Sequence, residues 1–259
     1  MSYLHLSRRS FVSQTWALTL ASLKSRYRNT VSGFLWVLLS PLLQYGAQAY
    51  AFYLILKLPV DNYPVFLLLG LIPWIFIISS VEMSTGSFTN QGRLLKSFPI
   101  HPWVPLMAQI ADNLINFALV FLFLMIPVTI LTSFQAISLL VLPLALLPIF
   151  VGTFSLSLLL STLNVFFRDT KFIVSFSTSI LFFLTPVFYP ESIIPEDFRW
   201  VPAVNPIYYM IRPFRGLETA FEGSQFWIHL GEAYVVAGGL MLWAIWYWGR
   251  KKNELYFNI

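Results

Sequence analysis

The stretch NLINFALVFLFLMIPVTILTSFQAISLLVLPLALLPIFVGTFSLSLLLSTLNVFF, residues 113–167, contains no Asp, Glu, Lys or Arg. A helix needs roughly 20 apolar residues to cross the hydrocarbon core of a bilayer, so this stretch is long enough for two crossings. The division between them rests on a weak polar break at Thr132, Ser133 and Gln135. The stretch therefore predicts two membrane helices joined by a short turn.

The rest of the chain has the same character. Hydrophobic residues make up 58% of its 259 residues and charged residues only 10%, a mixture that one soluble core cannot hide. Four more stretches are free of charge: 29–56, 62–81, 172–190 and 233–249. We predict an all-α integral membrane protein with six transmembrane helices, near 33–57, 65–81, 104–132, 138–163, 172–188 and 227–248.

The basic residues predict the orientation of these helices, because cytoplasmic flanks carry an excess of Lys and Arg. With the N-terminus inside, 12 of the 16 basic residues flank the inner ends, and Lys57, Arg199, Arg212 and Arg215 flank the outer ends. Six crossings then place both termini in the cytoplasm. Basic residues beside apolar segments, rather than on one soluble face, also argue against a nucleic-acid partner.

Two segments outside the crossings have patterns of their own. Val12, Trp16, Leu20, Leu23 and Tyr27 recur every three or four residues, which indicates an amphipathic helix in the inner interface or an ordinary juxtamembrane anchor. The 186–226 segment mixes eight charged residues with six prolines and many apolar side chains. It is too apolar for a solvated loop and too broken for a crossing, so we expect short re-entrant helices at the outer leaflet.

We therefore expect a single transmembrane domain, 1–259. Its parts are the interface helix at 1–30, crossings one to five within 33–185, the outer segment 186–226, crossing six at 227–248 and a cytoplasmic tail at 249–259.

The sequence offers little support for chemistry in this chain. It has no cysteine, its three histidines lack metal-ligand spacing, and it contains neither a Gly-x-Ser-x-Gly elbow nor a glycine-lysine pair for a phosphate loop. We expect no catalytic, metal or cofactor site. If transport is driven by ATP, another polypeptide must supply the motor.

Polar residues within the predicted crossings are the remaining candidates for function. Gln109, Asp112, Asn113 and Asn116 share one helical face, which either bonds neighbouring helices or lines a pathway. Gln44 and Gln48 share a face of the first crossing, among aromatic residues. Aromatic rings with amides suit sugars, although an interface belt or simple packing would also explain the rings.

Four motifs, in order over nearly the whole chain, resemble the permease subunits of ABC transporters that export polysaccharides, the family of O-antigen, capsule and teichoic-acid exporters. They are RYRNTVSGFLWVLLSPL (26–42), NQGRLLKSFPIHPWVP (90–105), LNVFFRDTK (163–171) and PEDFRWVPAVNPIYYMIRPFRGLE (195–218). One departure is that Ile100 and His101 stand where relatives often carry a charged pair after Phe-Pro, which puts any contact made by that pair in doubt.

The resemblance implies a homodimer in the bacterial inner membrane with two copies of an ATP-binding subunit, which would hold ATP and Mg. It implies contact with that subunit through Arg26, Arg28, Gly33, Asn90, Lys96 and Phe98. A channel for a lipid-linked glycan would be walled by Trp36, Tyr45, Tyr53, Phe183 and Phe188. An outer gate would include Trp200, Asn205, Pro206 and Tyr208.

The leading expectation is export of a lipid-linked polysaccharide, most of all O-antigen. Capsule or teichoic-acid export, export of small hydrophobic drugs, and a membrane-embedded glycosyl- or acyltransferase stay open as alternatives.

Overall fold

The structure is a computed structural model that describes residues 8–27, 33–55, 60, 62–132, 134–221 and 223–258. Within these ranges the regular secondary structure is helical and contains no strand. The all-α class predicted from the sequence is confirmed.

Among the described residues, four helices are long and apolar enough to cross a membrane. They are α3 (Tyr63–Thr85), α6 (Trp103–Leu131), α7 (Leu142–Phe166), which is preceded by the 3₁₀ turn η3 (Ala136–Val141), and α11 (Gln225–Asn258). They coincide with the second, third, fourth and sixth predicted crossings. Apolar length alone located these helices, because each must bury its backbone polar groups in its own hydrogen bonds.

The first and fifth predicted crossings take a different form. The first is α2 (Gly33–Ala49), which continues directly into the π-helix η2 (Tyr50–Ile55). The fifth is α8 (Thr170–Leu184), only 15 residues long, or about 22 Å at 1.5 Å per residue. Taken singly, α2 and α8 are shorter than the roughly 20 residues that a crossing requires.

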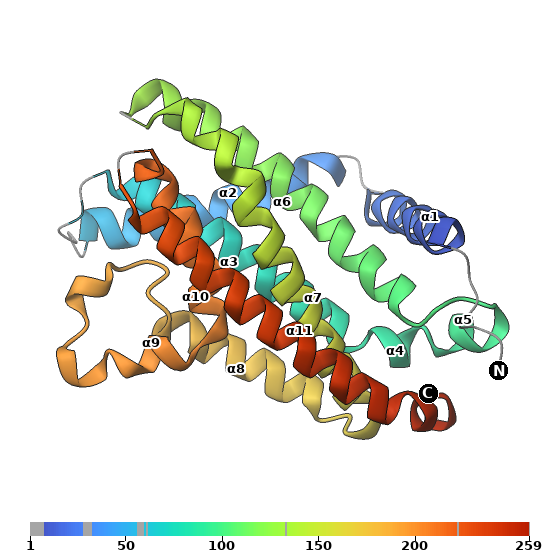
Figure 1. Cartoon of the computed structure of the whole chain (residues 1–259). Helices are drawn as coiled ribbons and strands as arrows, with labels where there is room; N and C mark the ends of the chain where they lie inside the picture. The colour runs from blue at the N-terminus through green and yellow to red at the C-terminus, as the bar shows by residue number, and fades with distance from the viewer. Residues whose placement is uncertain are drawn as a thin grey trace.

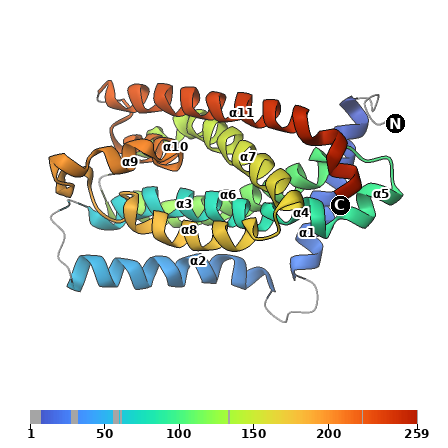
Figure 2. The ribbon, with the colours of Figure 1, turned by 90° about the horizontal axis from the view of Figure 1, so that it is seen from below.

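The long helices form a bundle with α3 and α7 at its centre. In Figure 2, α2 and α11 lie on opposite sides of the bundle, with α3, α8 and α7 between them. Buried side chains along α3, including Leu68, Leu71 and Ile77, join those of α6, α7 and α11 in one apolar core. The helix α8 packs against α3 on the side that α2 also contacts, so α2, α3 and α8 are neighbours.

One end of the bundle collects basic segments. There α1 (Arg8–Tyr27) packs on α6 across the direction of the long helices, and α4 (Ser87–Asn90), α5 (Gly92–Ser97) and the C-terminal end of α11 lie at the same end of the bundle (Figures 1 and 2). The Thr19 hydroxyl of α1 donates to the Ala108 carbonyl of α6 at 3.4 Å, whereas Val12 and Trp16 are exposed. The helix α1 therefore packs on α6 and the residues before it through Thr19 and Phe11, and its Val12 and Trp16 side chains face outward.

The opposite end of the bundle carries the outer segment, 186–226, which was predicted to form short helices. It forms the 3₁₀ turns η4 (Glu191–Ile193) and η5 (Glu196–Phe198), then α9 (Trp200–Val204), α10 (Pro206–Arg215) and the 3₁₀ turn η6 (Gly216–Thr219). Short helices are thus present where they were expected. Most apolar side chains of α10 are buried against α3, α7 and α11.

The last helix, α11, extends beyond the apolar run at 227–248 that was predicted as the sixth crossing. The helix continues to Asn258. Leu255 is fully buried, and the Lys251 ammonium pairs with the Glu254 carboxylate at 2.8 Å. Packing and this i,i+3 ion pair extend the helix beyond the apolar stretch.

Candidate functional site

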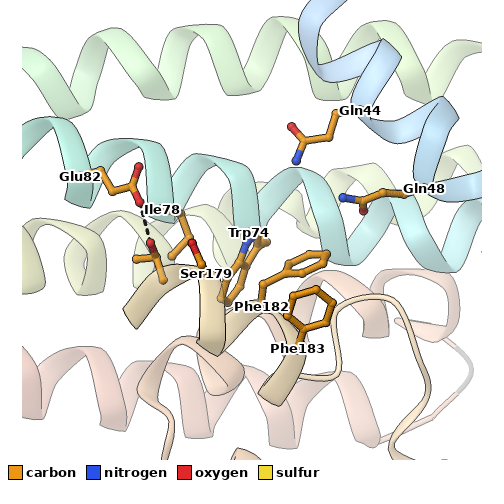
Figure 3. Close-up of a pocket in the computed structure, with 9 residues that line it drawn as sticks. Gln44, Gln48, Trp74, Ile78, Glu82, Ser179, Phe182 and Phe183 are labelled. Carbon is orange, nitrogen blue, oxygen red and sulfur yellow. Dashed lines mark hydrogen bonds between the residues drawn. The ribbon is translucent and has the colours of Figure 1, made fainter. Parts of the chain in front are cut away.

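A cleft of about 310 Å³ opens between α2, α3 and α8 (Figure 3). Its walls combine two amides, two hydroxyls and one carboxylate with aromatic and aliphatic surface. The lining residues are Gln44 and Gln48 of α2, Trp74, Ile78 and Glu82 of α3, and Thr178, Ser179, Phe182 and Phe183 of α8. The two glutamines that share a face of the predicted first crossing therefore meet residues more than 25 positions away in the chain.

One end of the cleft is polar. The Thr178 hydroxyl donates to Glu82 Oε1 at 2.6 Å, which joins α8 to α3 (Figure 3). Glu82 was not among the predicted site residues, because the second crossing was predicted to end at residue 81, immediately before this charge. In the structure α3 continues to Thr85. An acidic residue directly after an apolar run was the available signal.

The other end of the cleft is aromatic. The Phe182 ring lies 5.7 Å from Trp74 and 5.3 Å from Phe183, between ring centroids. Just beyond the cleft, Phe188 stacks on Phe52 at 4.2 Å and also contacts Phe182 at 5.2 Å. These rings form a continuous aromatic surface from α3 across α8 to η2.

The predicted wall residues are distributed unevenly about this cleft. Phe183 lines it, and Phe188 lies 6.0 Å from Phe183 in the adjoining aromatic cluster. Trp36 is exposed on α2 and does not line the cleft. The Tyr45 hydroxyl donates to the Pro64 carbonyl at 2.8 Å, which ties α2 to the start of α3. The side chain of Tyr53 lies outside the described residues.

The outer segment is held by a charged bridge centred on Arg212 of α10. Its guanidinium pairs with Glu232 of α11 at 2.6 Å and with Glu191 of η4 at 3.4 Å. The same guanidinium lies 5.0 Å from the ring centre of Tyr208. Desolvation, followed by hydrogen bonding to Glu191, raises the pKa of Tyr208 above its ordinary value. Arg212 thus ties three separate segments together.

A second arginine, Arg215, holds the face of α10 that packs against α3. It donates to the Val187 carbonyl at 2.8 Å, and its guanidinium lies 4.1 Å from the ring centre of Phe66. This packing depends on Gly70 of α3, where a Cβ would come within 2.7 Å of the Val187 carbonyl oxygen and 2.9 Å of the guanidinium. Absence of a side chain at Gly70 allows α10 to approach α3 closely.

The other predicted gate residues have distinct positions. Asn205 is buried and begins α10: its Oδ1 accepts from the Ile207 backbone N–H at 3.0 Å, and its amide donates to Thr185 at 2.7 Å. Pro206 occupies the first turn of α10, where a missing N–H costs nothing. Trp200 is exposed on α9. Asn205 therefore links the outer segment to the end of α8.

The residues predicted to contact an ATP-binding subunit gather at the α1 end of the bundle. Asn90, Lys96 and Phe98 are exposed there, on α4, on α5 and directly after α5. Gly33 is the first residue of α2. Arg28 and the side chain of Arg26 lie outside the described residues.

His101 is one of the two residues that depart from the family pattern, and it has a structural role. Its Nδ1 accepts from the Trp103 backbone N–H at 3.2 Å, and its ring lies 6.0 Å from Phe11 of α1. Burial lowers the pKa of His101, which favours a neutral imidazole. The residue thus joins α1 to the start of α6 without a charge.

The polar face of α6 lies largely inside the bundle. Asp112 and Asn113 are buried, and the Asn113 amide donates to Ser80 of α3 at 3.2 Å. Asn113 therefore bonds neighbouring helices, which was one of the two interpretations of this face. Across the described ranges no group of three or more His, Asp or Glu residues could hold a metal ion.

The apolar helices of membrane-spanning length define a multi-span helical membrane protein. The profile of the ABC-2 type transporter family matches residues 13–219, and the chain belongs to this family. It is accordingly a membrane component of a transport system.

Curated relatives support this membership. Two proteins of Klebsiella pneumoniae, each named O-antigen export system permease protein RfbA, are 33% and 35% identical over 207 residues, which cover 77% of this chain and 78% of each relative. A protein of the same name from Myxococcus xanthus is 27% identical over 206 residues, covering 80% of this chain and 77% of the relative.

Proposed function

We propose that this chain is the channel-forming subunit of an ATP-driven exporter that moves a lipid-linked polysaccharide, O-antigen in the first place, across the bacterial inner membrane. The observation that carries this proposal is the cleft between α2, α3 and α8. Its aromatic rings can cover the apolar faces of sugars, and its amides and hydroxyls can exchange hydrogen bonds with sugar hydroxyls. The names of the relatives point to the same class of substrate.

The proposal includes six crossings. The continuous helical segment formed by α2 and η2 has the length for one, and α8 with the packed residues that follow it supplies another. The outer segment then dips into the membrane without spanning it. Basic residues gathered at the α1 end support a cytoplasmic position for both termini.

The partners are inferred from the family and from the exposed α1 end. Two copies of this chain would enclose the channel, and two copies of an ATP-binding subunit, carrying ATP and Mg, would dock below them. Asn90, Lys96 and Phe98 stand exposed for that contact. The helix α1 would transmit the subunit's motion to α2 through the junction that contains Arg26, Arg28 and Gly33.

The gate is assigned to the outer segment. Arg212 and Asn205 tie α10 to η4, α11 and α8. A shift of α8 would therefore move α10 at the outer exit. Tyr208 and Pro206 belong to the same helix, and Trp200 precedes it.

Depletion of the chain in its native cell, followed by fractionation of surface and intracellular glycans, tests the proposal. We expect one surface polymer to disappear while its lipid-linked form accumulates inside. A polymer missing from both fractions would instead indicate an enzyme of synthesis. Unchanged glycans in both fractions would favour export of a drug or another lipid, and chemical analysis of an accumulated polymer separates O-antigen from capsule and teichoic acid.

A further inference from the structure

The charge of the α2–α3–α8 cleft is one-sided. Among the nine lining residues that the structure describes, Glu82 carries a negative charge and none carries a positive charge. The remaining polar groups are the neutral amides of Gln44 and Gln48 and the hydroxyls of Thr178 and Ser179. Any solute in the cleft therefore meets one carboxylate, neutral hydrogen-bonding groups and aromatic rings.

Glu82 is fixed at the polar end of this cleft. Thr178 donates to its Oε1 at 2.6 Å, which orients the carboxylate across the α3–α8 contact (Figure 3). A carboxylate can accept about four hydrogen bonds, and Thr178 supplies one of them. Acceptor capacity is thus available for hydroxyl or ammonium donors of a bound solute.

The aromatic end lies on the same wall. Trp74 and Glu82 are eight residues apart on α3, which corresponds to about 12 Å along the helix. Because Trp74 is buried and backs the ring of Phe182, a solute lying in the groove between α3 and α8 would meet the exposed ring of Phe183 at one end and the Glu82 carboxylate at the other.

We propose that this cleft is a binding groove for uncharged glycan segments and that Glu82 determines its specificity by excluding polyanions. An uncharged sugar gains stacking on Phe182 and the exposed ring of Phe183 and donates hydroxyls to Glu82. A phosphodiester or uronate would bring a second negative charge toward Glu82, and the lining residues that the structure describes include no cation to offset the repulsion. Amino sugars would be accepted for the opposite reason.

The inference rests on the proposed export function, so its test measures charge selection independently of transport. The chain contains no cysteine, and Ser179→Cys therefore places a single reporter thiol in the cleft of the full-length protein in membranes. Its reaction rates with cationic trimethylammonioethyl, anionic sulfonatoethyl and neutral hydroxyethyl methanethiosulfonates report the local potential. Ser224→Cys, at an exposed position before α11, is the matched control.

With Glu82 present, we expect the cationic reagent to react faster than the anionic one at residue 179, on the order of fivefold after each rate is divided by the rate of the same reagent with a free thiol in solution. Adding Glu82→Gln should bring this ratio close to one, whereas the ratio at residue 224 should not change. A ratio near one with Glu82 present, or one that Glu82→Gln leaves unaltered, overturns charge selection even if depletion abolishes a surface polymer.

The glycan itself gives the second readout. A polymer that depends on this chain and is uncharged or amino-substituted supports the groove, and a phosphate-rich or uronate-rich polymer overturns it. If depletion changes no glycan while the thiol ratio behaves as expected, the export function fails and the charge selectivity of the cleft stands.

Discussion

Replacement of Arg212 by methionine should loosen the outer segment, because this guanidinium is shared by Glu232 of α11 and Glu191 of η4 at 2.6 and 3.4 Å. Methionine keeps an unbranched apolar side chain of similar length and removes the charge. Both carboxylates then lose their partner, and α10 loses its ties to two other segments.

The size of the effect follows from burial. The Arg212 side chain is 19% exposed, and the Glu232 and Glu191 side chains are 37% and 42% exposed. Removing one partner of a fully buried pair costs about 3–5 kcal/mol, whereas an exposed pair contributes about 0–1 kcal/mol. A bridge of intermediate burial should contribute about 2 kcal/mol. For a chain of this size that corresponds to a decrease in melting temperature of about 4–8 °C.

Thermal unfolding of the detergent-solubilised full chain measures this decrease. The matched control is Arg199→Met, since Arg199 pairs with Glu196 at 3.3 Å while the two side chains are 60% and 85% exposed. We expect a change below about 1 °C for the control, because such surface pairs contribute little. If Arg212→Met and the wild-type protein have the same melting temperature, the Arg212 bridge does not hold α10. An equal decrease in melting temperature for Arg212→Met and Arg199→Met would refute that role as well.

Three further outcomes follow from the contacts. Gly70→Ala should destabilise the fold by about 1–3 kcal/mol through collision with the Val187 carbonyl, whereas Gly238→Ala, with open space around its Cβ, should be neutral or slightly stabilising in the same melting assay. Asn205→Ala should cost about 1–2 kcal/mol, because it removes the α10 cap and the bond to Thr185; unchanged melting contradicts that role. Because burial lowers the pKa of His101, the folded state resists its protonation, so stability should be lost as pH falls below about 6.5. His101→Asn keeps an acceptor for the Trp103 N–H, and its stability should decrease less between pH 7 and pH 5 than that of the wild-type protein. If the stability of the two proteins depends on pH in the same way, His101 does not contribute to this pH dependence.

The sequence located the long helices well because a membrane imposes one simple requirement. Apolar length marks α3, α6, α7 and α11, since no other local signal competes with it. The α8 region was harder to delimit, because the helix stops at Leu184 before Thr185 and Pro186, whereas its apolar composition continues to residue 190. Apolar length carries no information on the helical residues of α11 after 248, where Leu255 is buried and Lys251 pairs with Glu254.

The cleft was predicted only in part, for a reason of distance along the chain. Periodicity placed Gln44 and Gln48 on one face, and the family resemblance suggested Phe183, but pairing of Glu82 with Thr178 joins residues 96 positions apart. The Arg212 bridge likewise depends on how α10 folds back between η4 and α11. Such contacts are set by tertiary packing, and no local pattern in this single sequence carries them.

Photo-crosslinking of the substrate in living cells tests the central claim most directly. A photoreactive amino acid replaces Phe183, which lines the cleft, and in a second strain it replaces Val235 of α11, which is exposed away from the cleft. If the cleft is the export path, illumination should yield a glycan-bearing adduct of the chain at position 183 and none at position 235. Glycan adducts that are absent at 183, or equally abundant at both positions, would contradict the assignment of this cleft as the path of a lipid-linked polysaccharide.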